Sequence, residues 1–211
     1  IPSQVPTLAF FGVIKCLPSI VEFGLLQVLI LHLWGDDESI CFDLTRICEL
    51  FRLRYLHVTS NVTLEVQQTQ IRGLQYLESL KIDTGVSAVL SDIVHLPSLL
   101  HLSLPVGTNL PNGIGQMTSL CTLGYFDLCA TSVENVHSLG ELTNLKKLHL
   151  STWSKRFTLE QEDALVSSIG LLRDLKRLFL DWECRCSDPD SQMDSLHDPP
   201  PRLEELYLPN W

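Results

Sequence analysis

The chain has 211 residues, of which 45% are hydrophobic and 19% are charged, and its 25 acidic residues outweigh 15 basic ones to give a net charge of -10. This composition is typical of a globular chain, and no apolar run approaches the roughly 18 residues that a membrane span needs. The negative charge argues against nucleic acid or an anionic membrane as the main partner.

A repeated change in apolar spacing, from every third position to every second, runs through the whole chain. The fifth copy shows it fully, with Ile93, Leu96, Leu99, Leu102 and Leu104. Nine copies are present, with first strand anchors at positions 5, 26, 53, 77, 99, 120, 145, 175 and 203, so the repeat length runs from 21 to 30 residues. This length and pattern are typical of leucine-rich repeats.

Each copy predicts a short strand that buries alternate residues, preceded by a turn of helix or an extended loop that packs from the other side. One unit cannot bury its apolar face alone, so neighbouring units stack around a shared core. We therefore expect an α/β fold, a right-handed leucine-rich-repeat solenoid or horseshoe with a parallel concave sheet and short helices and loops on the convex side. An ordinary leucine-rich helical domain is the alternative, but its spacing would stay near 3.6 residues. The strands are expected near Leu29, Leu56, Leu80, Leu102, Leu123, Leu148, Leu178 and Leu206.

We expect a single domain, 1–211, of about nine repeats, and we expect it to be a fragment truncated at both ends. Residues at the two ends of the stack should then be partly exposed. They are Val5, Leu8 and Phe10 at one end and Leu206, Leu208 and Trp211 at the other.

The longest insertions come late in the chain. Thr158 and Gln161 have the spacing of a capping box, and Leu165, Ile169 and Leu172 follow at helical spacing, which predicts a convex helix over about 160–172. The segment 187–201 is polar and proline-rich and predicts a loop.

Alternation along the strands also predicts which side chains face away from the core. In the sixth strand it places Gly124 and Phe126 on the open, concave face of the sheet, away from the core, and Tyr125 in the core. The middle strands present small residues, whereas the last three present aromatic and charged ones, which interface hot spots favour. We predict a partner-binding surface there, formed by Lys147, His149, Ser151, Trp153, Arg177, Phe179, Asp181, Trp182, Glu205 and Tyr207.

Ordinary cross-strand pairing is the alternative interpretation of this surface. Phe179 would pack against Tyr207, and Arg177 would pair with Glu205, only to stabilise adjacent strands. Both interpretations can hold together.

Catalytic motifs do not appear: the chain lacks a phosphate-binding glycine loop, a Gly-x-Ser-x-Gly elbow and a His-Glu-x-x-His sequence, so we expect neither an enzyme nor a cofactor. The seven cysteines are scattered and odd in number, which favours reduced thiols in the cytoplasm. Cys184 and Cys186 lack two further ligands nearby, so no metal site is expected.

Several phrases of the sequence resemble the repeat domain of plant intracellular immune receptors of the nucleotide-binding, leucine-rich-repeat class, particularly the coiled-coil type common in grasses. They are residues 7–12, 23–31, 50–56 and 73–80, and the resemblance extends over essentially the whole chain. That family often has Asp where this chain has Ile30 and Arg where it has Gln27. These differences alter the concave strand near Ile30 without threatening the fold.

The resemblance implies a cytoplasmic protein-interaction domain of plant defence. Such repeats hold the receptor's own nucleotide-binding domain at rest and release it when a pathogen effector or a modified host protein is sensed. On this basis we expect His32, Tyr55 and His57 to contact the nucleotide-binding domain. ADP or ATP is expected only in that domain, which these 211 residues do not include.

Two other classes stay open. An extracellular leucine-rich-repeat receptor ectodomain would show a stricter period and several glycosylation acceptors, whereas Asn61-Val62-Thr63 is the only acceptor in the sequence. The other is a leucine-rich-repeat ubiquitin ligase, either a substrate adaptor or an enzyme with an appended catalytic domain. Flanking sequence would separate these cases.

Overall fold

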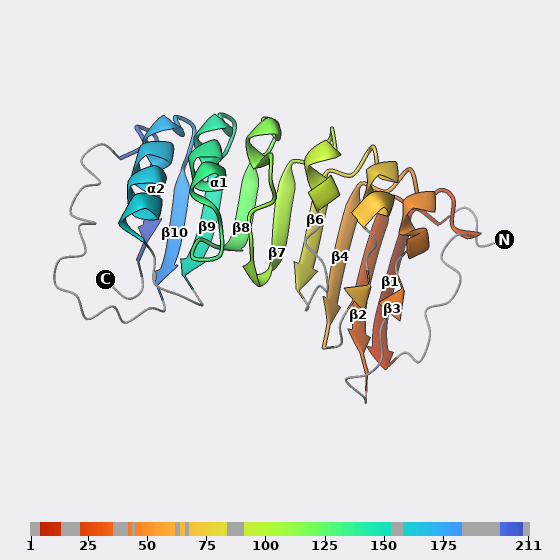
Figure 1. Cartoon of the computed structure of the whole chain (residues 1–211). Coiled ribbons are helices and arrows are strands. Elements are labelled where there is room, and N and C mark those ends of the chain that lie inside the picture. Colours follow the sequence, from red (N-terminus) through yellow and green to blue (C-terminus); the bar gives the residue numbers. More distant parts are fainter. Residues whose placement is uncertain are drawn as a thin grey trace. The chain divides into compact units, whose positions relative to one another are not determined.

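A computed structural model of the chain describes residues 5–13, 22–35, 42–43, 45–61, 64–65, 68–83, 91–152, 158–182 and 199–208. The chain divides into two compact units, Ile1–Pro105 and Val106–Trp211. In each unit, parallel strands form one layer and short helical elements form a second layer beside them (Figure 1). We call the strand face turned away from the helical layer the open face.

The sheet of the first unit has the strand order β1-β2-β4-β6-β7, with parallel neighbours throughout. Its strands are β1 (Thr7–Val13), β2 (Val28–Trp34), β4 (Tyr55–Ser60), β6 (Ser79–Asp83) and β7 (His101–Thr108), the last of which continues past the unit boundary. A separate parallel pair joins β3 (Phe42–Asp43) to β5 (Leu64–Glu65). The helical elements are the 3-10 helices η3 (Thr45–Glu49), η4 (Gln68–Gly73) and η5 (Ser91–His95).

The steps of three in the sequence produce the 3-10 geometry. Residues three apart in such a helix lie on the same side, so Ile47 and Leu50 both face the core. The amide of Leu50 donates to the carbonyl of Ile47 at 3.0 Å, and the amide of Leu53 donates to the carbonyl of Leu50 at 2.9 Å, which carries the chain into β4. Along the sheet, buried leucines pair in register from repeat to repeat, in the series Leu29, Leu56, Leu80 and Leu102.

The second unit contains a parallel sheet of order β8-β9-β10-β11. Its strands are β8 (Thr122–Asp127), β9 (Lys147–Thr152), β10 (Arg177–Trp182) and β11 (Glu205–Tyr207). Its helical elements are η6 (Ile114–Gln116), α1 (Val133–Ser138), η7 (Leu139–Glu141) and α2 (Leu159–Leu171). No described helix of the chain is long and apolar enough to cross a membrane.

Helix α2 confirms the predicted convex helix and its capping box. The Thr158 hydroxyl accepts from the Gln161 amide at 3.2 Å, and the Gln161 side-chain oxygen accepts from the Thr158 amide at 3.0 Å. The Gln161 side-chain nitrogen then donates to the carbonyls of Leu128 and Thr131, at 3.1 and 2.8 Å. One side chain thus begins the helix and fixes it to the preceding repeat.

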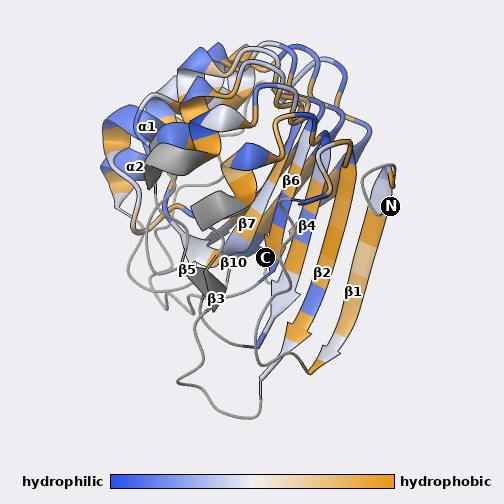
Figure 2. Cartoon of the chain, turned by 90° about the vertical axis from the view of Figure 1, so that its right-hand side faces the viewer, coloured by the Kyte–Doolittle hydropathy of each residue, from blue (hydrophilic) through white to orange (hydrophobic). Residues whose placement is uncertain are grey.

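The observed strands lie at the positions that the leucine spacing predicts, and the solenoid fold class is confirmed. The helical alternative is wrong, because the repeated leucines lie on parallel strands. Figure 2 shows the hydrophobic character of β1 and β2. Val5 and Leu206 are 36% and 49% exposed, and Leu8, Phe10 and Leu208 are half-buried, as expected at the ends of the stack. Trp211 and most of the predicted loop 187–201 lie outside the described residues.

Candidate partner-binding surfaces

Four rings form a row across the open face of the second unit. Tyr125 of β8, His149 of β9, Phe179 of β10 and Tyr207 of β11 have successive ring centroids 4.2, 5.5 and 5.9 Å apart. The parallel register produces this order, because His149 pairs with Phe179 and Phe179 pairs with Tyr207. We call these four residues the aromatic row. Tyr125 and Tyr207 are 38% and 56% exposed, so the row offers ring surface to a partner.

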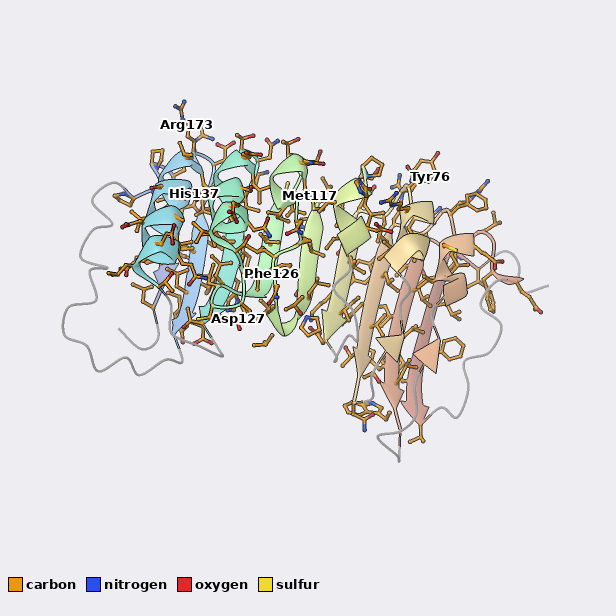
Figure 3. The ribbon with its side chains drawn as sticks, in the orientation of Figure 1. Tyr76, Met117, Phe126, Asp127, His137 and Arg173 are labelled. Atoms are coloured by element: carbon orange, nitrogen blue, oxygen red, sulfur yellow. The ribbon has the colours of Figure 1, made fainter. Side chains whose placement is uncertain are left out.

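A β-bulge in β8 places Tyr125 in the row and overturns the sequence prediction for this strand. Between Gly124 and Phe126 the pairing with β9 shifts by one residue, so Phe126, not Tyr125, lies opposite Leu150. Phe126 is completely buried (Figure 3), whereas the prediction placed it on the open face. Gly124 is also buried, but it pairs with His149 of the aromatic row, so its predicted place on the open face is confirmed.

Tyr125 has a φ of 68°, and it is the only described residue other than glycine with a positive φ. This left-handed conformation costs a tyrosine about 1 kcal/mol or more. A glycine inside a strand pattern often marks a bulge, so Gly124 was the signal in the sequence that the simple alternation overlooked.

The cations on this face have internal contacts. The Arg177 Nε lies 3.2 Å from Glu205 Oε2, which confirms the predicted cross-strand pair. The Lys147 ammonium lies 5.3 Å from the centroid of the Phe179 ring, at cation–π distance. Both sides of the Arg177–Glu205 pair are about half exposed, so the pair contributes at most about 1 kcal/mol of stability.

The other predicted residues of this surface differ in accessibility. Asp181 is half-buried, and within the described part of the chain its carboxylate has no ion pair or hydrogen bond. Ser151 is 3% exposed, and its hydroxyl donates to the Phe126 carbonyl at 3.2 Å, so it offers a partner little surface. Trp182 ends β10, and Trp153 lies outside the described residues.

The His149 imidazole is kept neutral by its surroundings. Burial between its neighbours lowers its pKa below the usual 6.5, the charge of Asp181 acts in the opposite direction, and Lys147 lowers the pKa further. At neutral pH the aromatic row therefore carries no charge of its own.

The lowered pKa of His149 predicts a loss of stability in mild acid. Because the folded chain holds this proton more weakly than the unfolded chain, the stabilising contribution is present above the unfolded pKa of 6.5 and is lost as pH falls through the lower folded value. Urea unfolding of the wild type and of His149→Gln, at about pH 7 and about pH 5, measures this contribution. The wild type should lose more stability than the variant between the two conditions. Equal losses would contradict the prediction.

A second ring cluster lies on the open face of the first unit and contains all three residues predicted to contact the nucleotide-binding domain. His32 and His57 have ring centroids 5.3 Å apart, and Tyr55 lies edge-on to His57 at 6.5 Å. Phe11 stacks on His32 at 4.8 Å and is 70% exposed. We call Phe11, His32, Tyr55 and His57 the front cluster.

Polar side chains fix the orientation of His57. Its Nε2 lies 3.2 Å from Asp83 Oδ2 and 3.1 Å from the Thr59 hydroxyl, and the Lys81 ammonium lies 2.8 Å from the same Asp83 oxygen. The sequence prediction did not select Phe11 or Asp83, although alternation put both on the open face. The cluster is thus an aromatic surface bounded by a charged pair.

The described residues contain no group of three or more His, Cys, Asp or Glu side chains that could hold a metal ion. Cys184 and Cys186, which were considered as ligands, lie outside those residues.

Three comparisons relate the chain to known proteins. The family model of a leucine-rich repeat region matches residues 5–211. Disease resistance protein RGA5 of Oryza sativa subsp. japonica is 51% identical over 182 residues, a match that covers 84% of this chain and 16% of RGA5. The chain thus spans less than a fifth of that relative.

Solved structures support the fold alone, because their sequence identities are low. A leucine-rich-repeat protein of Leptospira interrogans has a TM-score of 0.63 at 22% identity, with 98% of this chain and 55% of that chain covered. Internalin C2 of Listeria monocytogenes has a TM-score of 0.54 at 17% identity, with 83% of this chain and 80% of that chain covered.

Proposed function

The chain belongs to the leucine-rich-repeat family, and from its likeness to RGA5 we propose that it is the ligand-sensing repeat domain of a cytoplasmic plant immune receptor. In this role it binds a protein ligand, either a pathogen effector or a modified host protein. It also restrains the nucleotide-binding domain of the same receptor until the ligand arrives. We propose that the nine repeats act as one domain.

The likeness to RGA5 carries this proposal. The chain is 51% identical to a disease resistance protein over most of its length, whereas the solved structures support only the fold. Because the chain spans 16% of RGA5, the activities of the rest of the receptor belong to the proposal as well.

The two ring clusters suggest a division of tasks. We assign ligand binding to the aromatic row with its neighbours Lys147, Arg177, Asp181 and Glu205, because exposed aromatic and arginine side chains are typical anchors of protein interfaces. We assign the contact with the nucleotide-binding domain to the front cluster. The chain itself is proposed to be non-enzymatic and to hold no cofactor, with ADP or ATP held by the nucleotide-binding domain.

The restraint is tested by Tyr55→Ala/His57→Ala in the full-length receptor. Removing both rings weakens the proposed contact, so the receptor should trigger leaf cell death without ligand. Cell death is scored in leaves at matched protein levels. Tyr76→Ala is the control, because Tyr76 is 58% exposed on a turn outside the open face (Figure 3). A double variant that stays silent without ligand, at wild-type abundance, would remove the front cluster from the proposal.

A further inference from the structure

We propose that the aromatic row binds an arginine-containing segment of the partner protein, with one guanidinium stacked on the rings at the Phe179 and Tyr207 end and paired with Asp181. This inference rests on the proposed role of the row in ligand binding and names the chemistry of the ligand. Four features of the second unit support it: the exposed rings, the pairing of Arg177 with Glu205, the neutral histidine and the backbone strain at Tyr125.

The rings offer faces that suit a planar cation. A guanidinium is attracted to the negative face of an aromatic ring and is more weakly hydrated than an ammonium. Phe179 already takes the Lys147 ammonium at 5.3 Å, which shows that a cation is accommodated on this row. Tyr207 is 56% exposed, and among the described residues its ring contacts only Phe179.

One carboxylate beside the row is available to a basic partner. Arg177 is paired with Glu205, and Lys147 is turned over Phe179, whereas the Asp181 carboxylate has no ion pair or hydrogen bond among the described residues. Asp181 follows Phe179 by two residues on β10, so both side chains face the same side of the sheet. A guanidinium stacked beside Phe179 can therefore donate to the Asp181 carboxylate.

The neighbouring histidine does not oppose this charge. His149 stays neutral at pH 7 because burial lowers its pKa, although the charges of Asp181 and Lys147 both reach it. The whole chain carries a net charge of -10, which draws a basic partner toward it at long range.

Strain at Tyr125 indicates that the row serves a purpose other than folding. The bulge holds this tyrosine at a φ of 68° while leaving it 38% exposed. Strained residues with exposed side chains are typical of binding sites, because the fold alone would favour glycine there. Tyr125 lies at the end of the row remote from Asp181, so it marks how far the bound segment extends.

The test uses the full chain and a short synthetic peptide in which arginines alternate with Gly-Ser pairs. Matched peptides carry lysine, citrulline or glutamate in place of arginine. Chemical-shift titrations should place the arginine peptide on the aromatic row, with a Kd about tenfold lower than that of the lysine and citrulline peptides. An arginine peptide that binds no better than the lysine peptide, or a glutamate peptide that binds more tightly, would overturn the proposal.

Two variants and one control separate specific binding from general attraction. Asp181→Asn and Tyr125→Gly should each weaken arginine-peptide binding about tenfold, while Asp163→Asn, on the exposed side of α2, should leave it unchanged. Tyr125→Gly should also unfold at the same or a higher temperature, because glycine relieves the backbone strain. Equal weakening by Asp163→Asn, or a lower melting temperature for Tyr125→Gly, would count against the proposal.

The outcome is independent of the receptor assay. A chain that binds arginine peptides but supports no receptor signalling would refute the receptor role alone. A receptor that signals through a chain without arginine preference would refute this inference alone.

Discussion

Phe126→Ala is expected to lower the free energy of unfolding by about 3–5 kcal/mol, because it removes a completely buried ring and leaves a cavity in the second unit. Its neighbour Tyr125 is 38% exposed and lies outside the core. Tyr125→Ala removes an exposed ring that, among the described residues, contacts only the His149 ring, so it should cost less than about 1 kcal/mol. The two substitutions thus differ by several kcal/mol although the residues are adjacent.

Urea unfolding of the two variants in parallel measures this difference. The bulge in β8 predicts that Phe126→Ala is the costly change, whereas simple alternation from Leu123 predicts that Tyr125→Ala is. If Tyr125→Ala proves the more destabilising of the two, β8 does not contain the bulge.

The repeat architecture could be predicted from the sequence because it depends on spacing alone. A step of three sets a 3-10 turn and a step of two sets a strand, and both recur at fixed phase in every repeat. The convex helix could be predicted as well, because Thr158 and Gln161 carry its start signal within the first turn.

The bulge could not be predicted by alternation, because one inserted residue reverses the inward and outward assignments after it. The choice between Tyr125 and Phe126 as the core residue depends on which ring fits opposite Leu150, and that is a property of the neighbouring strand. A count of positions along one strand contains no such information.

The charge of the predicted surface also changed once contacts were known. The sequence indicated a basic and aromatic cluster, but Arg177 is neutralised by Glu205 and Lys147 lies over Phe179. Contacts between neighbouring strands determine which charged groups are already paired and which can still pair with a partner, and the residue types on one strand do not. Phe11 joined the front cluster through its contact with His32, and Asp83 was found beside it through its contact with His57.

The second large effect is expected from Arg177→Ala/Phe179→Ala in the full-length receptor. These substitutions remove the central ring of the aromatic row and the guanidinium beside it, and truncating such anchors typically costs 2 kcal/mol or more of binding, so the ligand should bind at least about thirtyfold more weakly. The cost in stability should be smaller, because a half-exposed ion pair and one cross-strand ring pair together contribute only about 1–2 kcal/mol. The double variant is therefore expected to lose ligand binding while it keeps most of its folding stability.

The role of the aromatic row is tested most directly by a leaf cell-death assay with the ligand, run on this double variant and on Glu160→Ala/Asp163→Ala, a control pair of exposed residues on α2. Protein abundance is measured in the same leaves. We predict that the Arg177→Ala/Phe179→Ala receptor accumulates normally and fails to respond to the ligand, while the control pair responds like the wild type. A full response from the Arg177→Ala/Phe179→Ala receptor at normal abundance would mean that the aromatic row is structural, and would contradict its assignment as the ligand-binding surface.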